Sequence, residues 1–241
     1  MNTGIYSAVS GGVAAMTRLD AIANNIANAS TPGFKAERYV QHAARAGSEL
    51  PPPTAVETPI SRGHLETDFS QGEIEPTGNP LDVALSGPGF LVVEGAHGER
   101  LTRRGTLAVD AEGFLATSDG LRVQGEAGDL PIGGAPVTVT GDGTVRVGDA
   151  AVGKLRIVTV ENPAALTREG GTTFAAGRQP LVPVTSEQTQ VIAGALEGAN
   201  CSPIQSLVAL VDTMRGFEAY MHAADRLDQV TAKAITDVGR V

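Results

Sequence analysis

The sequence has little cysteine, few aromatic residues and no long apolar run, and each shortage excludes a class of protein. The single cysteine, Cys201, excludes an internal disulfide, and structural zinc clusters need several closely spaced Cys and His residues. No apolar run reaches the roughly 18 residues of a membrane span, so we expect no direct membrane insertion. The first ten residues lack a basic stretch followed by an apolar one, so we expect no cleaved secretory leader.

Positive charge is also scarce. The chain has 18 Lys and Arg residues against 27 Asp and Glu, a formal net charge of −9. Proteins that bind a phosphate backbone are usually basic, so a nucleic-acid partner is not expected. Glycine, in contrast, is abundant, with 30 residues in 241, while aromatics make up only 4%. This composition predicts many tight turns and a β-rich core of small aliphatic side chains.

The N-terminal segment, residues 3–30, has the spacing of a helix that packs lengthwise against other helices. Apolar or small residues recur at steps of four and three: Ile5, Val9, Gly12, Met16, Leu19, Ala23 and Ile26. Gly11 and Gly12 weaken this helix by about 1 kcal/mol each relative to Ala, although they permit close backbone approach. Pro32 cannot continue the helix, and Gly33 supplies the freedom for a turn.

The C-terminal segment predicts a second, much longer helix over residues 203–238, about 50 Å at 1.5 Å per residue. Ser202 suits the N-cap and Pro203 the first helical position. Its stripe again steps by three and four: Met214, Phe217, Met221, Ala224, Asp228, Thr231, Ile235 and Val238, with Leu207, Leu210 and Val211 extending it upstream. Because Asp228 and Thr231 interrupt the stripe, this is not a simple buried helix.

Residues 36–195 alternate short apolar runs with turn signals, which is typical of antiparallel strands. The clearest hairpin is "VTVTGDGTVRVG", in which Val137 and Val139 face Val145 and Val147 across Gly141–Gly143. Residues 49–59, "ELPPPTAVETP", are too rich in proline for regular structure and suggest an extended linker.

Together these patterns predict an α+β fold, in which the N- and C-terminal helices pair lengthwise in a coiled-coil-like core and a central antiparallel β-rich domain lies outside it. The predicted divisions are the first helix and turn (1–35), an extended linker or β segment (36–75), a β-rich outer domain (76–195) and the C-terminal helix (196–241). Two helices of unequal length make a poor isolated bundle, so we expect other subunits to complete them. Asn24, Asn25 and Asn28 then either face solvent at the helix end or form hydrogen bonds between subunits.

No cluster of residues indicates enzyme chemistry, a cofactor or a metal. The four histidines, at 42, 64, 97 and 222, stand far apart. Asp110–Gly113 lacks the spacing of a calcium loop, and Gly87-Pro88-Gly89 lacks the third glycine of a dinucleotide site. Cys201 has no evident base partner. We therefore predict no catalytic, cofactor-binding or metal-binding residues.

Four segments resemble one family, the bacterial flagellar axial proteins of the rod and hook. They are "ANNIANASTPGFK" (23–35), "QGEIEPTGNPLDVALSGPGFLVVEG" (71–95), "LTRRGTLAVDAEGFLATSDGLRV" (101–123) and "GALEGANCSPIQSLVALVDTMRGFEAY" (194–220), in the family's order. The sequence departs from the family pattern at Gly198–Cys201, where Ser-Asn-Val is usual, and at Leu91, where a second aromatic is common.

The resemblance implies a structural rod subunit that polymerises through its terminal helices into the axial tube transmitting motor torque. It implies export without a cleaved leader through the flagellar type III apparatus, a place in the periplasmic rod of the basal body, and partners among other copies and neighbouring rod proteins. The opening and the length favour a proximal position; a distal rod or hook-type role is the alternative within the family. Outside it, the alternative is a secreted β-domain glycan-binding protein or hydrolase.

The residues predicted to form the subunit interface combine the two stripes, the asparagines and the aromatic after the turn: Ile5, Val9, Met16, Leu19, Asn24, Asn25, Ile26, Asn28, Phe34, Leu207, Val211, Met214, Phe217, Met221, Leu227 and Ile235.

Overall fold

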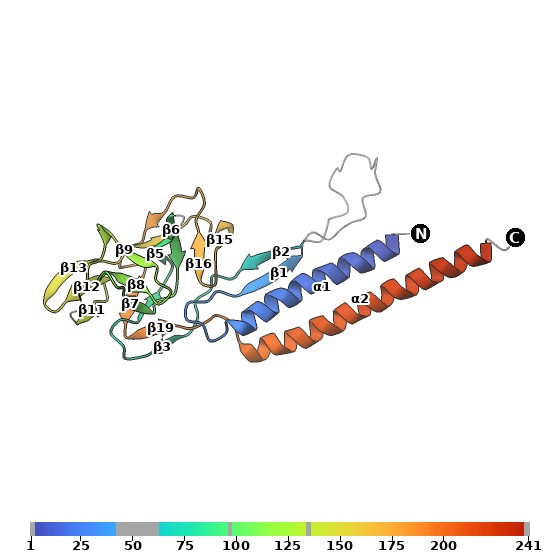
Figure 1. The fold of residues 1–241 in the computed structure, drawn as a ribbon, viewed down its shortest axis with the longest axis horizontal. Coiled ribbons are helices and arrows are strands. Elements are labelled where there is room, and N and C mark those ends of the chain that lie inside the picture. Colours follow the sequence, from blue (N-terminus) through green and yellow to red (C-terminus); the bar gives the residue numbers. More distant parts are fainter. Residues whose placement is uncertain (1–2, 42–62, 96–97, 134–135, 239–241) are drawn as a thin grey trace. The chain divides into compact units, whose positions relative to one another are not determined.

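The computed structural model describes residues 3–41, 63–95, 98–133 and 136–238 (Figure 1). The linker expected at 49–59, and two of the four histidines, His42 and His97, lie outside these ranges. Contacts divide the chain into two units. The helical unit holds residues 1–27, 37–67 and 202–241, and the β body holds residues 28–36 and 68–201.

The helical unit contains the two long helices and one hairpin. Helix α1 runs from Thr3 to Ala27 and α2 from Pro203 to Val238, the range predicted for the C-terminal helix. Strands β1 (Glu37–Gln41) and β2 (Gly63–Thr67) pair antiparallel, and β1 contacts α1. The helices are antiparallel, because Gly4 lies against Leu227 and Gly11 against Tyr220 (Figure 1). In the described part of the chain, neither helix is long and apolar enough to cross a membrane.

The expected α+β fold with a coiled-coil-like core is wrong. The described chain has two helices and a large β-rich body, and several predicted stripe positions stay outside the contact between the helices. Val9, Met16 and Met214 are 49%, 58% and 48% exposed. The buried positions of α1 instead include Ala8 and Ile22, each one residue, or about 100° of helical turn, before a predicted stripe position. Glycines on this face of α1 leave room for large side chains of α2, such as Tyr220 and Leu227, to approach closely.

The β body consists of short antiparallel strands. Their bounds are β3 Ile74–Pro76, β4 Val83–Ser86, β5 Phe90–Gly95, β6 Gly98–Thr102, β7 Leu107–Val109, β8 Leu115–Thr117, β9 Arg122–Gly125, β10 Gly128–Asp129, β11 Val137–Val139, β12 Thr144–Val147, β13 Ala150–Lys154, β14 Ile157–Thr159, β15 Thr167–Arg168, β16 Thr173–Ala175, β17 Val182–Pro183, β18 Gln190–Ala193 and β19 Ala195–Glu197. A 3₁₀ turn, Pro163–Ala165, begins at the Asn162 cap.

The largest sheet has the strand order β15-β16-β6-β5-β9-β8-β7, with β10 paired to β9 and β14 paired to β5 and β17. Strands β11-β12-β13 form a second sheet, and β18-β4 and β19-β3 form two-stranded sheets. The predicted hairpin is confirmed, since Val137 pairs with Val147 and Val139 with Val145.

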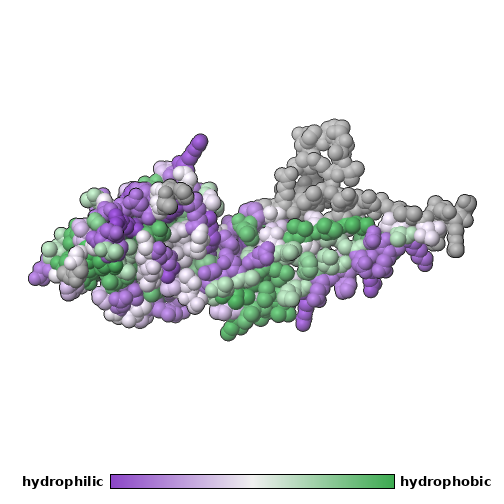
Figure 2. Space-filling model, viewed as in Figure 1, coloured by the Kyte–Doolittle hydropathy of each residue, from purple (hydrophilic) through white to green (hydrophobic). Residues whose placement is uncertain are grey.

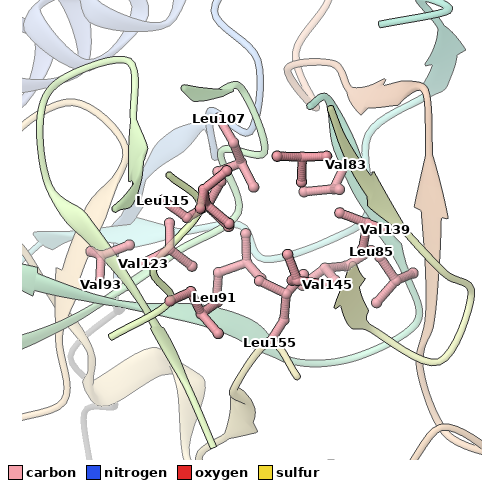
Figure 3. Close-up of a cluster of buried hydrophobic side chains, with 14 residues drawn as sticks. Val83, Leu85, Leu91, Val93, Leu107, Leu115, Val123, Val139, Val145 and Leu155 are labelled. Atoms are coloured by element: carbon pink, nitrogen blue, oxygen red, sulfur yellow. The ribbon is translucent and has the colours of Figure 1, made fainter. Parts of the chain in front are cut away.

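Two apolar clusters fill the β body. The larger gathers side chains from eight strands and the segments between them, including Leu91, Leu115, Val145 and Leu155, which converge in Figure 3. The second lies around Phe90 and Phe174. Aliphatic side chains dominate both clusters, as the aromatic-poor composition predicts. This packed body gives rigid support to the segments that lead into the helices.

Candidate functional site

The outer face of α2 carries exposed apolar side chains over its first three turns. Ile204, Leu207, Val208, Val211 and Met214 recur at steps of three and four and are 47–75% exposed. We call these five residues the α2 patch, which Figure 2 shows as a green area over the beginning of α2. Burying one such side chain contributes about 1.5–3 kcal/mol, and contiguous apolar patches are typical of interaction surfaces.

Beyond Met214 the same face of α2 becomes polar. Arg215, Glu218, His222 and Asp225 are all exposed and continue the spacing of the patch toward the C-terminus. The change shows in Figure 2 as purple along the later part of the helix. On this face the apolar stretch therefore ends after the first three turns.

Helix α1 carries a smaller group of the same kind. Val9, Val13 and Met16, spaced at i, i+4 and i+7, are 49%, 61% and 58% exposed. We call these three residues the α1 patch. Each helix thus presents an apolar face that the described chain leaves open to solvent.

The predicted interface residues fall into three groups. The exposed ones are Val9, Met16, Leu207, Val211, Met214, Met221 and Leu227. The half-buried ones are Ile5, Leu19, Asn24, Ile26, Asn28 and Phe217, while Asn25 and Phe34 are buried. The side chain of Ile235 lies outside the described part of the chain. The prediction followed one stripe on each helix and therefore missed the exposed residues Val13, Ile204 and Val208. The steps of four from Val9 to Val13 and from Ile204 to Val208 could have indicated them.

The asparagines at the end of α1 have partners within the chain. Asn25 accepts a hydrogen bond from the Glu37 N–H (2.9 Å) and donates one to the Glu37 carbonyl (2.7 Å), so its amide extends β1 like one more strand residue. Asn24 Nδ2 lies 3.5 Å from the Glu37 carboxylate, and Asn28 accepts from the Thr31 hydroxyl (3.4 Å). These bonds hold the start of the hairpin against α1 and shape the turn that follows it.

A buried cluster of charges lies in the β body where segments leading to the helices converge. The Glu197 carboxylate, at the end of β19, receives the Lys35 ammonium at 2.5 Å and the Arg103 guanidinium at 3.2 Å. The side chains of Lys35 and Glu197 are fully buried, and that of Arg103 is 5% exposed. Breaking a buried pair of this kind typically costs about 3–5 kcal/mol, because one charge is left without a partner.

Burial sets the ionisation of this cluster. Removal from water lowers the pKa of the Lys35 ammonium below its usual value, Glu197 opposes that shift, and the Arg103 cation adds to it. Burial likewise lowers the pKa of Arg103. Both cations contact the one Glu197 carboxylate, the Asp68 carboxylate also favours the charged form of Lys35, and backbone carbonyls of Ser70, Leu85 and Gly87 accept further hydrogen bonds.

Asn200 connects three segments beside this cluster. Its Oδ1 accepts from the Ala36 N–H (2.7 Å), and its Nδ2 donates to the Asp68 carbonyl (2.7 Å) and the Ser70 carbonyl (3.1 Å). Sequence reasoning identified residues 198–201 only as a departure from a family signature. The available signal was Asn200 itself, which keeps the asparagine of the family signature three residues after Glu197. Its role depends on contacts with residues more than 100 positions away in sequence.

Phe34 is buried against the same region. The Arg168 guanidinium lies 5.0 Å from the centroids of both the Phe34 and Phe174 rings. The same side chain donates a hydrogen bond to the Lys35 carbonyl. The aromatic that follows the Pro32-Gly33 turn is therefore covered by this chain's own β body.

In the described part of the chain, two hollows are lined by residues outside the charged cluster. One, of about 390 Å³ in the β body, is lined by residues that include Glu126, Lys154 and Arg156. The other, of about 270 Å³ in the helical unit, is lined by α1, α2 and β1 and includes Gly11 and Tyr220. In the ranges that the structure describes, no group of His, Cys, Asp and Glu side chains is placed to hold a metal ion.

Comparison with known proteins gives two family matches. The family described as "Flagella basal body rod protein" matches residues 5–35, which span most of α1 and the turn after it. The family described as "Flagellar hook protein FlgE/F/G D1 domain" matches residues 84–147, which run from β4 to β12 in the β body.

Full-length relatives agree. The chain is 32% identical to the flagellar basal-body rod protein FlgF of Escherichia coli and 31% identical to that of Salmonella typhimurium, covering 97% of each pair of chains. It is 30% identical to the flagellar basal-body rod protein FlgG of Agrobacterium fabrum, over 94% of this chain and 97% of that one.

Proposed function

Because this chain belongs to the flagellar basal-body rod protein family, it is a structural subunit of the flagellar basal body, and we propose that it polymerises through the α1 and α2 patches into the axial rod that transmits motor torque. The observation that carries this proposal is the exposed α2 patch, which the described chain does not cover. A second copy or a neighbouring rod protein with a matching apolar face is the partner that fits. In such a helical assembly each subunit offers different surfaces to its neighbours, so the contacts do not close a ring.

Three finer points belong to the same proposal. The subunit occupies a proximal position in the periplasmic part of the rod, which the opening and the length of the sequence favour. The flagellar type III export apparatus delivers it there. It performs no enzymatic reaction, since a role as an assembly subunit rests on surface contacts and needs no reactive group. Cross-linking in isolated basal bodies, with identification of the neighbours, separates a proximal from a distal position.

The assembly surface is tested by placing a charge on it. We expect Val208→Glu, a change at an exposed position, to leave the isolated chain folded and to prevent its incorporation into basal bodies, because the carboxylate would be buried against a partner without a counter-charge. Complementation of a strain that lacks the gene, followed by a motility assay and detection of the subunit in purified basal bodies, measures the effect.

The matched control is His222→Glu, which adds the same charge to the same face of α2 in its polar part. It should support motility. If Val208→Glu were incorporated as efficiently as His222→Glu, the α2 patch would not be an assembly surface.

A further inference from the structure

Beyond a role in assembly, we propose that the buried cluster around Glu197 and Asn200 is a mechanical clamp, which binds together the chain passages between the helical unit and the β body. The inference rests on the proposed role in carrying torque. Every residue of the clamp belongs to the β body. Its parts come from the turn after α1, the segment after β2, and the segment between β19 and α2.

The chain passes between the two units four times, after residues 27, 36, 67 and 201. Any force on the helices reaches the β body through these passages. Ala36 is the last residue before the second passage, Asp68 is the first after the third, and Asn200 comes shortly before the fourth. Loads on the two helices therefore arrive at neighbouring points of the β body.

One layer of hydrogen bonds joins these three residues in a closed triangle. The Asp68 N–H donates to the Ala36 carbonyl at 2.8 Å. Asn200 accepts from the Ala36 N–H and donates to the Asp68 carbonyl, each at 2.7 Å. Because every segment is bonded to both others, none can be pulled away without breaking two contacts together.

A second layer repeats the connection one step further into the β body. Lys35 Nζ donates to the Ser70 carbonyl at 2.6 Å and to Glu197 at 2.5 Å. The Gly72 N–H donates to the Glu197 carboxylate at 3.0 Å, and the Gly33 N–H donates to the Glu197 carbonyl at 2.7 Å. The two layers thus join the same three segments through different atoms.

Arg103 attaches this second layer to the rest of the body. It contacts Glu197 and donates to the carbonyls of Leu85, at the core strand β4, and of Gly87. Bonds to charged groups that are shielded from water are stronger than ordinary ones. Because they share the load, rupture requires several of them to fail at once instead of one after another.

The two cations on the Glu197 carboxylate suggest a variant that weakens the clamp without unfolding the body. Lys35→Met removes one of two cations, and Glu197 keeps its partner Arg103, so no buried carboxylate is left unpaired. Asn200→Ser provides a second variant, which shortens the side chain of the outer triangle and leaves every charge in place.

The test is force spectroscopy on the purified full-length chain. Cys201→Ser removes the single native thiol, and Gln205→Cys on α2 and Ala165→Cys in the β body, both at exposed positions, provide the attachment points. At a fixed force we expect Lys35→Met and Asn200→Ser to release the segment before α2 about tenfold faster or more, the order expected for one lost bond to a charged or buried group. The unmodified clamp should hold until the β body itself unfolds.

Asp119→Asn is the control, because it breaks the partly exposed Arg104–Asp119 pair (2.7 Å) beside Arg103 in sequence and leaves the clamp intact. It should release at the reference rate. If both clamp variants were folded by circular dichroism and released no faster than this control, the clamp would be refuted; if Lys35→Met failed to fold, Asn200→Ser alone would decide. Because the measurement uses single chains, it is independent of the assembly tested with Val208→Glu.

Discussion

At the scale of single residues, two independent constraints require glycine at position 33: the backbone conformation and the lack of space for a Cβ atom. Its φ of +71° lies in the left-handed region that glycine adopts without strain. A Cβ there would also lie 2.4 Å from the Arg104 nitrogen and 2.5 Å from the Arg103 carbonyl carbon, which are backbone atoms that cannot swing aside. The Pro32-Gly33 pair in the sequence indicated the turn, but the second demand comes from a segment about 70 residues away.

Gly33→Ala should therefore destabilise the β body by more than backbone strain alone. We expect a loss of about 3 kcal/mol or more in the free energy of unfolding, since an unfavourable φ costs roughly 1–2 kcal/mol and an overpacked contact about 1–3 kcal/mol. Urea unfolding followed by circular dichroism measures it.

Gly78→Ala is the matched control. Gly78 has a similar φ of +74°, yet a Cβ there would meet nothing within 4 Å. It should lose only the roughly 1–2 kcal/mol of backbone strain. Equal losses for the two variants would show that the contact with Arg103 and Arg104 contributes nothing.

At the scale of elements, glycine in α1 sets how the two helices meet. A Cβ on Gly11 would lie 2.4 Å from the Tyr220 ring, so the ring occupies space that only glycine leaves. At Gly12 the nearest atoms, from Met221 and Phe217, would be 3.8 Å away, which is an ordinary contact. Of these two neighbouring glycines, only Gly11 is therefore required for the close packing of α2 on α1.

The pair Gly11→Ala and Gly12→Ala separates helix propensity from packing. Each change should add about 1 kcal/mol of helix propensity. Gly12→Ala should keep that gain, whereas Gly11→Ala should displace Tyr220 and loosen the contact between α1 and α2. Hydrogen exchange of the α1 amides measures the outcome.

Replacing Tyr220 by Ala in the Gly11→Ala background should relieve the steric part of the loss. Equal protection of α1 in the Gly11→Ala and Gly12→Ala variants would contradict this account of the contact.

At the scale of the whole molecule, the two units differ in what stabilises them. The β body contains two apolar clusters and the buried charged cluster, whereas the helical unit leaves both apolar patches exposed. Units with such different burial are expected to open with different free energies. The aromatic residues provide a probe, because all three tyrosines, Tyr6, Tyr39 and Tyr220, belong to the helical unit and the chain has no tryptophan.

We expect tyrosine emission to report an unfolding transition at lower urea concentration than the loss of amide protection in the β body. The tyrosine transition should also move to higher urea as protein concentration rises, because self-association covers the patches in the folded state. The transition of the β body should not move. Coincident transitions at every concentration would show a single cooperative structure and contradict this division.

Much of this arrangement was determined by sequence alone. The steps of three and four fixed both helices, and Ser202-Pro203 placed the start of α2. Alternating valines around Gly141–Gly143 determined the register of β11 and β12, because both signals depend on residues close together in the chain. The family resemblance followed from four motifs in order and led to the rod assignment that the full-length relatives confirm.

The tertiary structure alone decided which faces are covered. Spacing shows which residues share a face, but only the contacts between the helices decided that Val9 and Met16 of α1 are exposed and that Ile22 is buried. Asn25 and Asn200 likewise found their partners only in the fold. The Lys35–Glu197 pair joins residues 162 positions apart, and no local pattern encodes a contact of that range. Local periodicity determined the elements, whereas close approach between distant segments determined the surfaces they leave open.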